Sequence, residues 1–265
     1  MRISVLGATG TIGSLVSKKL EQKGHDVRRV SRSLGYDLTQ EAHVQRAVEQ
    51  ADLVIDCLNI DTLSTKKALA FFEGTASRIA AAAQEAGVGR IICLSIYGVN
   101  KQAVARGYGY YAGKAAQEAA YQAGAVPVTI IESAQWFELL PVIVSKTTMA
   151  GICLLASMRI APVAAERVAS LVADQVEERS EGQNRITIRG PEVLDIKTAV
   201  ESWLSIKGEI AGLNPRFVFQ LPYLGKAIAG GDLVPEEGLV DEVSLSDWLK
   251  GTPEGTRPRR GQGYR

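Results

Sequence analysis

The feature that most constrains the fold is a glycine-rich segment directly after the first short apolar run. Arg2–Leu6 is typical of a strand, GATGTIG follows it, and a helical pattern begins at about Ile12. Gly7 permits a tight turn out of the strand, Gly10 lets backbone approach a pyrophosphate, and Gly13 lets the helix pack close to the sheet. Amides at a helix N-terminus attract anions. The segment predicts a dinucleotide phosphate loop, and a glycine turn without ligand is the less favoured alternative. Its candidate cofactor-binding residues are Gly7, Thr9, Gly10, Thr11, Ile12 and Gly13.

Short apolar runs alternate with longer helical patterns as far as residue 131. This order predicts an α/β fold, a Rossmann-type doubly wound parallel sheet with helices on both faces. Strands buried on both faces read as continuous apolar runs, as these do. We expect strands at Arg2–Leu6, Asp26–Val30, Asp52–Leu58, Arg90–Ser95 and Val128–Ile131, and helices at about Ile12–Lys23, Gln40–Gln50, Thr65–Ala86 (broken or kinked near Gly74) and Tyr110–Gln122.

The pattern is less regular after residue 132 and predicts a small C-terminal α/β substrate lobe. The domain boundaries that follow are 1–160 for the NAD(P)-binding core, 161–250 for the part that completes the fold and forms the lobe, and 251–265 for a disordered basic tail. The apolar stretch Leu139–Met158 contains Pro141 and Lys146 and falls short of a membrane span of ~20 apolar residues. We interpret it as buried helix and strand near a pocket. Further elements are expected at about Gln135–Ser145, Glu166–Glu178, Ile196–Lys207 and Tyr223–Gly230 (helices) and at Arg185–Ile188 and Phe217–Gln220 (strands).

Composition restricts the classes of partner. The 265 residues carry a net charge of +1, so no overall field favours nucleic acid or an anionic membrane, and we expect neither partner. Three cysteines without a CxxC pair and two histidines without ligand spacing predict no metal site and buried free thiols in a reducing compartment. The short apolar run at the N-terminus is better used as a strand than as a signal peptide, so we expect a cytoplasmic protein.

The end of the second strand indicates which dinucleotide is bound. NAD-selective sites usually place a carboxylate about twenty residues beyond the glycines, on the ribose hydroxyls. Here that position carries Ser31 and Arg32, and a guanidinium pairs with a 2′-phosphate. NADP(H) is therefore preferred over NAD(H), unless Arg29 and Arg32 are ordinary solvated arginines. Further cofactor-binding candidates are Asp37 and Leu38, beside the adenine, and Leu58 and Asn59, at the end of the strand Asp52–Leu58.

Three residues are candidates for catalysis. Tyr110 and Lys114 are four apart and share one helix face, so the ammonium could lower the pKa of the phenol and make it a general acid or base. Lys114 could also hold the nicotinamide ribose. Ser95 ends a strand at the same sheet edge, where its hydroxyl could bind a substrate carbonyl. The alternative is a tyrosine packed on the core beside an exposed lysine.

Several segments together resemble the atypical short-chain dehydrogenase/reductases of the NmrA-like, NAD(P)H-binding family. They are GATGTIG at 7–13, AAAQEAGVGRIICLSIYG at 81–98, YYAGKAAQE at 110–118, VTIIESAQWFE at 128–138 and APVAAERVA at 161–169. The resemblance implies a Rossmann core with a variable C-terminal lobe, and a substrate cleft lined by residues 133–137 and 160–163. It also implies that the lysine position is more dependable than the tyrosine. The substrate candidates are Ser133, Gln135, Trp136 and Phe137.

Two functions remain open at this point. The first is an NADP-dependent oxidoreductase that transfers hydride between NADPH and a small, mostly apolar carbonyl, quinone or enone. The second is a non-catalytic NADP(H)-binding redox sensor of the NmrA type, which would need a protein partner. The aromatic pair Trp136 and Phe137 either stacks on a flat substrate or packs the helix against the lobe, and Met149, Leu154, Leu155 and Met158 would add apolar wall. A homodimer is an open alternative, and a sugar-nucleotide epimerase relative is a third, less favoured reading.

Overall fold

The computed structural model describes residues 1–178, 184–251 and 259–260. The chain forms two compact units, and each is described by itself. Unit 1 consists of residues 1–132 and 168–186, and unit 2 of residues 133–167 and 187–265. The boundary expected at residue 160 stays a prediction. The disorder expected for 251–265 falls almost wholly outside the described residues, which include only Gly251, Arg259 and Arg260 of that tail.

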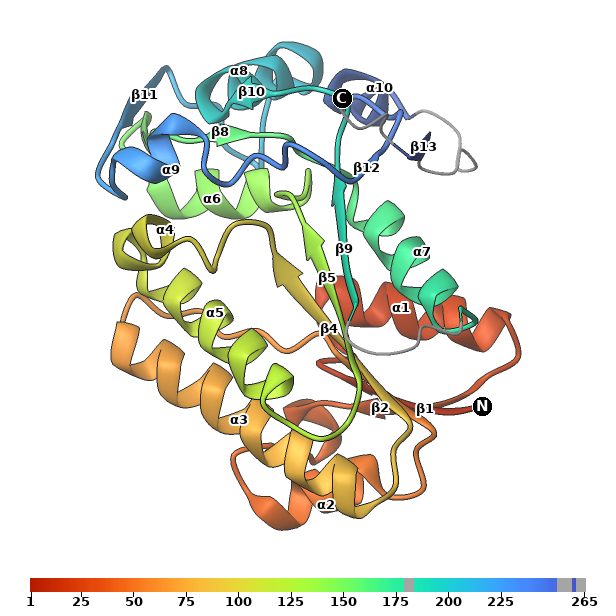
Figure 1. The fold of residues 1–265 in the computed structure, drawn as a ribbon. Helices are drawn as coiled ribbons and strands as arrows, with labels where there is room; N and C mark the ends of the chain where they lie inside the picture. Colours follow the sequence, from red (N-terminus) through yellow and green to blue (C-terminus); the bar gives the residue numbers. More distant parts are fainter. Residues whose placement is uncertain (179–183, 252–258, 261–265) are drawn as a thin grey trace. The chain divides into compact units, whose positions relative to one another are not determined.

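Unit 1 is built on a mostly parallel sheet with helices on both faces, which confirms the predicted Rossmann-type fold class (Figure 1). From one edge the strand order is β2-β1-β3-β4-β5-β9, and the first four pair in parallel. The central strands are almost wholly buried and mostly apolar because both of their faces are covered, whereas β2, at the edge, carries Arg28 and Arg29. The strands are β1 Arg2–Leu6, β2 Asp26–Val30, β3 Leu53–Asp56, β4 Arg90–Ile96, β5 Val128–Ser133 and β9 Asn184–Arg189.

The helices of unit 1 cover both faces of this sheet. In Figure 1, α3 and α5 run side by side over one face, and α1 and α7 lie over the other. Lys23, just past α1, binds Asp174 of α7 at 3.0 Å, so these two helices meet at one end. The helices are α1 Thr11–Gln22, α2 Glu41–Val48, α3 Thr65–Glu85, α4 Gln102–Gly107, α5 Gly109–Gln122 and α7 Ala165–Gln175, with a 3₁₀ turn, η1, at Arg32–Leu34.

Three local expectations for unit 1 need correction. Helix α3 runs unbroken through Gly74, because the Arg78 guanidinium donates to the Gly74 carbonyl at 2.8 Å and the surrounding residues are good helix formers. Strand β3 ends at Asp56 rather than Leu58, because the Asp56 carboxylate accepts from the Leu58 amide at 2.7 Å and turns the chain out of the sheet. Helix α4, before α5, was not expected.

Unit 2 contains short sheets and short helices. A three-stranded sheet has the order β11-β7-β6, β10 pairs antiparallel with β8, and the end of β9 pairs with β12, which pairs with β13. The strands are β6 Thr148–Met149, β7 Ile152–Ala156, β8 Arg159–Ile160, β10 Leu194–Asp195, β11 Phe217–Leu221, β12 Leu239–Val240 and β13 Arg259–Arg260. The helices are α6 Leu139–Thr147, α8 Ile196–Lys207, α9 Lys226–Gly230 and α10 Leu245–Leu249.

The interpretation of Leu139–Met158 as wholly buried is wrong. This stretch forms α6 and an unexpected β6–β7 hairpin, and α6 begins at Leu139 instead of near Gln135. Met149 is 82% exposed and Leu154 is 41% exposed, whereas Leu155 and Met158 are buried. The hairpin alternates its side chains between two faces, so a continuous apolar run has one face in the core and one outside it. Within the part of the chain that the structure describes, no helix has the length and apolar character to cross a bilayer.

Candidate functional site

The glycine loop between β1 and α1 has the tight geometry that its sequence predicts. Gly7 has φ +75°, and a Cβ on it would lie 2.6 Å from the Cys57 carbonyl oxygen. A Cβ on Gly13 would lie 2.2 Å from the Gly7 carbonyl oxygen. At Gly10 the same distance is 3.3 Å, so that glycine is sterically the least constrained of the three. The folded loop therefore requires glycine at Gly7 and Gly13. At Gly10 the missing side chain instead leaves the loop backbone accessible to a ligand.

Helix α1 begins immediately after this loop without a side-chain cap. Gly10 occupies the N-cap position, and the first turn starts at Thr11. Thr9, Gly10 and Thr11 are exposed, while the Ile12 side chain is buried in the core, so only its backbone amide is placed to face a ligand. A helix start leaves its first amides without intrahelical partners, and its partial positive charge favours an anion. The residues present therefore fit the diphosphate of a dinucleotide.

The end of β2 is bonded to the glycine loop. The Val30 carbonyl accepts hydrogen bonds from the amides of Gly7 at 2.9 Å and Ala8 at 3.1 Å. The chain then continues into Ser31, whose hydroxyl lies 2.9 Å from that of Ser33, and into Arg32 at the start of η1. The expected phosphate loop and the expected selectivity residues are thus brought together in unit 1.

The two arginines near this strand end differ in their environments. Arg29 makes a two-pronged ion pair with Glu21, with both nitrogen–oxygen distances at 2.8 Å. Arg32 is exposed, and no ion pair or hydrogen bond to another described residue holds its guanidinium. Of the two arginines, Arg32 is therefore the one that is free to meet a phosphate.

Asp37 and Leu38 have structural roles that their sequence position did not reveal. The Asp37 carboxylate accepts from the Thr39 backbone amide at 3.1 Å, the Thr39 hydroxyl at 2.7 Å and the Gln40 side-chain Nε2 at 2.9 Å. These hydrogen bonds lower the pKa of Asp37 to about 2. Leu38 is buried in the core. The carboxylate organises the turn before α2, and its role toward adenine stays a prediction.

The end of β3 reaches both the glycine loop and α5. Leu58 follows the Cys57 carbonyl that lies against Gly7, and Asn59 is exposed one residue further on. The Tyr110 hydroxyl donates to the Asn59 carbonyl oxygen, Oδ1, at 2.8 Å. The ring of Tyr110 packs edge-on against Phe72 at 5.5 Å and stacks on Tyr108 at 6.0 Å. This chain of contacts connects the candidate proton donor to the candidate cofactor loop.

The expected effect of Lys114 on Tyr110 is wrong. Burial raises the pKa of Tyr110 above its ordinary value, and the Lys114 ammonium does not offset it. The reason is that Lys114 is only 4% exposed and points elsewhere. Its Nζ donates to the Leu94 carbonyl at 2.7 Å and to Gln117 Oε1, and it lies 5.1 Å from the centre of the Phe72 ring. The alternative of an exposed lysine is equally wrong.

Ser95 is also engaged inside unit 1. Its hydroxyl donates to Glu118, a buried carboxylate one helical turn beyond Lys114. Arg185 of β9 donates to Glu118 at 2.9 Å and also to the buried Glu132 of β5. Ser95, near the end of β4, therefore lies next to the Leu94 carbonyl that Lys114 of α5 binds, but each of the two side chains already has a protein partner.

Sequence reasoning missed the buried polar groups that surround these candidates. Asp56 is fully buried and accepts from the Tyr121 hydroxyl at 2.6 Å and from Gln117 Nε2 at 2.7 Å. Gln117 and Tyr121 follow Lys114 at three and seven residues, so the helical period could have placed them on its face. Nothing local in the sequence connects Arg185 to Glu118, which lies 67 residues earlier.

The four predicted substrate residues all belong to unit 2. The Ser133 hydroxyl, at the end of β5, accepts from Trp136 Nε1 at 2.9 Å. Both polar atoms of the Gln135 amide are buried, and neither has a hydrogen-bond partner among the described residues. Phe137 is fully buried and packs on Trp248 with 5.3 Å between the ring centres. Of the four, Gln135 is the one whose polar group is left for a ligand, and all four assignments stay predictions.

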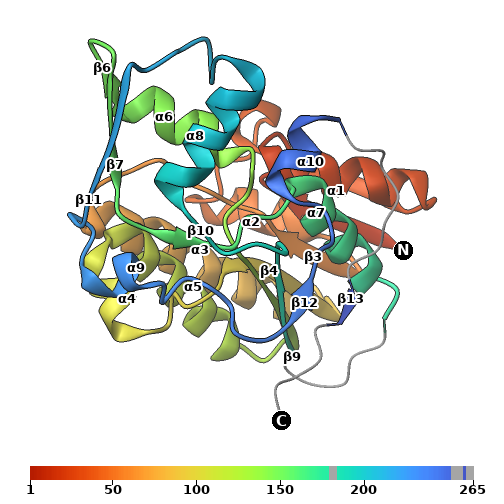
Figure 2. The same ribbon diagram turned by 90° about the horizontal axis from the view of Figure 1, so that it is seen from above.

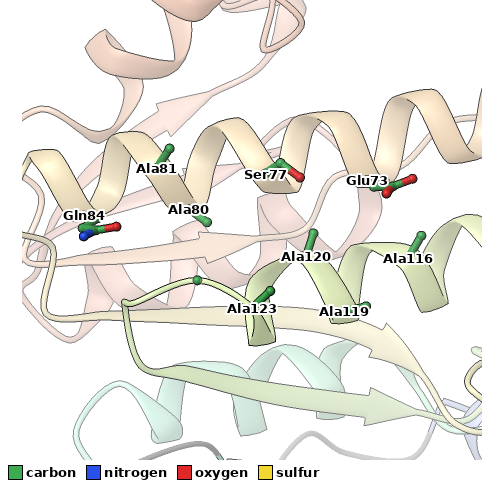
Figure 3. Close-up of a pocket in the computed structure, with 10 residues that line it drawn as sticks. Glu73, Ser77, Ala80, Ala81, Gln84, Ala116, Ala119, Ala120 and Ala123 are labelled. Atoms are coloured by element: carbon green, nitrogen blue, oxygen red, sulfur yellow. The ribbon is translucent and has the colours of Figure 1, made fainter.

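A shallow hollow elsewhere in unit 1 is distinct from this region. Figure 3 shows it between α3 and α5, which run side by side. It is lined by the C-terminal parts of both helices, near the turns that lead into the starts of β4 and β5. The glycine loop follows the C-terminal end of β1 and Ser95 lies near the C-terminal end of β4, which is the opposite edge of the sheet, where ligands of such sheets bind. Its lining residues are Glu73, Ser77, Ala80, Ala81, Gln84, Ala116, Ala119, Ala120, Ala123 and Gly124.

Within the described ranges, no group of three or more His, Cys, Asp or Glu residues could hold a metal ion.

Comparisons with known proteins agree with this architecture. A family model described as NAD(P)H-binding matches residues 7–179. No curated protein matches the sequence.

Solved structures share the fold at low sequence identity. A nucleoside-diphosphate-sugar epimerase from Staphylococcus aureus is 14% identical with a TM-score of 0.70, over 94% of this chain and 100% of its own. The UDP-glucuronic acid 4-epimerase from Bacillus cereus, in complex with UDP-glucuronic acid and NAD, is 16% identical with a TM-score of 0.69, and the match covers 94% of this chain and 97% of that protein. A short-chain dehydrogenase/reductase superfamily protein from Agrobacterium tumefaciens with bound NAD is 14% identical with a TM-score of 0.64, and the match covers 94% of this chain and 90% of that protein.

Proposed function

Because this chain belongs to the NAD(P)H-binding family, we propose that it is an NADP-dependent oxidoreductase of the short-chain dehydrogenase/reductase type. Its substrate is a small, mostly apolar carbonyl, quinone or enone. The observation that carries the proposal is the meeting of three strand ends at one loop. The amides of the glycine loop bond to Val30 of β2, and Gly7 lies against Cys57 beyond β3. This is where a doubly wound sheet binds a dinucleotide.

The preference for NADP rests on Arg32. The guanidinium lies two residues beyond the Val30 carbonyl that holds the loop, and the structure leaves it without a competing carboxylate. Arg32 has no acceptor atom, and Ser31 offers one oxygen where a carboxylate offers two to the pair of ribose hydroxyls. A 2′-phosphate instead supplies the anion with which the exposed guanidinium of Arg32 can pair. Two of the solved neighbours hold NAD, so the preference for NADP is a property that we assign to this chain's own residues.

The reaction divides between coenzyme and protein. When bound, reduced nicotinamide supplies the hydride. Tyr110, whose phenol burial keeps protonated, supplies the proton only after its hydroxyl leaves Asn59 Oδ1, to which it donates at 2.8 Å. Lys114 binds the nicotinamide ribose only after its ammonium releases the Leu94 carbonyl or Gln117. Ser95 likewise polarises an acceptor only after it leaves Glu118.

A second candidate function is a redox sensor of the NmrA type that binds NADP(H) without turnover and reports to a partner protein. The hydrogen bonds that Lys114 and Ser95 make inside unit 1 favour the sensor, because side chains held in this way stabilise the fold without facing a substrate. A third candidate is a sugar-nucleotide epimerase, which is what two of the compared proteins are. The similarity of this chain to those two epimerases is a similarity of fold.

Stopped-flow absorbance at the NADPH band separates these functions. The wild-type protein is mixed with NADPH and a panel of quinones, enones and aldehydes. In parallel it is incubated with NAD and UDP-glucuronic acid, and the UDP-sugars are then separated by chromatography, because epimerisation causes no net change in the coenzyme absorbance. The oxidoreductase consumes NADPH with at least one acceptor of the panel. Tight NADPH binding without consumption would favour the sensor, and interconversion of the UDP-sugar would favour the epimerase. Either of these results overturns the first proposal.

A further inference from the structure

The outer face of the three-stranded sheet in unit 2 is apolar where a solvated face is expected. Strands β7 and β11 pair in parallel with Phe217 opposite Ile152 and Phe219 opposite Leu154. Because side chains alternate along a strand, these four residues and Leu221 share one face, while Cys153 and Leu155 are buried on the other. Figure 2 shows β7 and β11 lying along each other, with β6 at the end of the hairpin. We name this surface the β7–β11 face and define it by Met149, Ile152, Leu154, Phe217, Phe219 and Leu221.

The size of the β7–β11 face distinguishes it from scattered surface hydrophobics. Its six side chains are 41% to 82% exposed. At ~180 Å² for a large apolar side chain, they present roughly 600 Å² to solvent. That value is at the upper end of the ~300–600 Å² of the largest patch on a monomer. It also equals the contribution of one partner to an interface of about 1,200 Å², the lower limit for a stable complex.

The chemistry of the β7–β11 face identifies its partner. None of its six members carries a charge or a hydrogen-bonding side chain, so two identical faces can meet without burying a charge. Faces that bind membranes combine apolar residues with Lys or Arg, and this face contains neither. Phe217 and Phe219 are stacked with their ring centres 6.3 Å apart, which presents a rigid aromatic anchor. Two apolar sheet faces pack well against each other at about 10 Å.

We propose that the β7–β11 face binds a second copy of this chain, sheet face against sheet face, in a two-fold dimer. Such an interface is self-complementary, because each residue of the patch meets the same patch on the partner. The interface closes after two copies, so no filament forms. The proposal is independent of coenzyme binding and of catalysis.

Sedimentation equilibrium of the full chain tests this proposal. The wild-type protein is expected to be a dimer. Phe219→Glu places a charge at the centre of the face and should raise the dimer dissociation constant by about 100-fold. Leu63→Glu is the matched control, because Leu63 is an 85% exposed apolar residue of unit 1, outside the face. It should leave the dimer intact.

A second variant keeps the test decisive if Phe219→Glu does not fold. Phe219→Cys removes bulk without adding charge, and a short bis-maleimide should then couple two copies through this position. Cys93 and Cys153 are buried and Cys57 is half-buried, so the wild-type protein treated in the same way measures the coupling that does not involve position 219. A monomeric wild-type protein, a dimer that Phe219→Glu leaves unchanged, or a dimer broken instead by Ala120→Glu in the α3–α5 hollow would each overturn the proposal. Co-sedimentation of the monomer with phosphatidylcholine vesicles would do the same.

Discussion

At the scale of single residues, function depends on which polar side chains already have partners. Arg29 and Arg32 are three residues apart and look equivalent in the sequence. Arg29 is neutralised by Glu21, with two contacts of 2.8 Å, whereas Arg32 is exposed and free of a carboxylate. A guanidinium without an anion is the one that gains most from a 2′-phosphate. The selectivity of the site should therefore depend on Arg32 alone.

Replacement of Arg32 tests this selectivity. Arg32→Ala should weaken NADPH binding by about 10- to 100-fold, since a hydrogen-bonded charge pair contributes roughly 1.5–3 kcal/mol. NADH binding should change little. Titration calorimetry with both coenzymes measures the difference, and Arg29→Ala is the control that should alter neither affinity. Equal losses for NADPH and NADH would show that Arg32 does not contact the 2′-phosphate.

Tyr110 is the candidate for proton transfer, and Tyr110→Phe tests it. Removal of the hydroxyl should slow turnover by about 10²- to 10⁴-fold, the usual contribution of a general acid. The ring contacts with Phe72 and Tyr108 remain, so NADPH affinity should be nearly unchanged. Steady-state rates and calorimetry together provide the measurement. A rate equal to that of the wild type would exclude the phenol from the mechanism.

The pH dependence of the same reaction has a definite sign. Burial raises the pKa of Tyr110 above the ordinary value near 10, so the phenol stays protonated throughout the neutral range. A proton donor works below its pKa. Substrate reduction should therefore be independent of pH from about 6 to 9 and decline only at higher pH. A midpoint near pH 7 would instead indicate that a depressed tyrosine pKa controls the rate.

At the scale of secondary-structure elements, the turn from β1 into α1 separates folding from binding. Gly13→Ala places a Cβ 2.2 Å from the Gly7 carbonyl oxygen, which α1 can relieve only by moving away from the sheet. We expect the variant to lose about 3 kcal/mol of unfolding free energy, at the upper end of the roughly 1–3 kcal/mol that overpacking typically costs. At Gly10 the corresponding distance is 3.3 Å, so Gly10→Ala should fold with nearly wild-type stability. Chemical denaturation of both variants measures the difference, and equal stabilities would contradict it.

Helix α5 is joined to β4, β5 and β9 by a cluster of charges in which the two carboxylates are buried and Arg185 is partly exposed. Arg185 bridges Glu118 and Glu132, whose side chains are 3% and 4% exposed. Arg185→Met would leave two buried carboxylates without their cation and should cost about 3 kcal/mol of unfolding free energy. Arg29→Met removes a two-pronged pair at the surface and should cost about 1 kcal/mol or less. Similar thermal shifts for the two variants would show that this cluster of charges is not structurally important.

The fold was predictable because its signals are local. The glycine loop, the continuous apolar strands and the period of Ile196–Lys207 each specify their element without knowledge of any distant residue, and the structure confirms them. The β6–β7 hairpin escaped prediction because its turn is Ala150 and Gly151, both at positive φ, rather than a strong turn pair such as Asn-Gly. Its apolar run therefore looked continuous.

The candidate site was predictable only in part. The positions of Tyr110, Lys114 and Ser95 on the fold follow from helix period and strand ends. Their partners do not, because Asn59, Leu94, Glu118 and Arg185 come from elements far apart in the sequence. The direction of the Tyr110 pKa was wrong for this reason. Helical spacing placed Lys114 on the right face, but the Leu94 carbonyl and Gln117 hold its ammonium.

At the scale of the whole molecule, the chain combines a coenzyme unit with a second unit that carries an uncovered apolar face. The family model covers residues 7–179 and thus includes nearly all of unit 1. The β7–β11 face lies entirely in unit 2. Coenzyme binding and self-association should therefore respond to different substitutions, with Arg32→Ala affecting the first and Phe219→Glu the second.

The central claim is that backbone amides at the start of α1 bind the diphosphate of an adenine dinucleotide. Titration calorimetry of the wild-type protein and Gly10→Ala with NADPH tests it most directly. The account predicts a one-to-one complex with the wild type and a loss of that binding in Gly10→Ala, which keeps its fold but fills the space over the loop. An absence of heat with every adenine coenzyme, or unchanged affinity in Gly10→Ala, would contradict it.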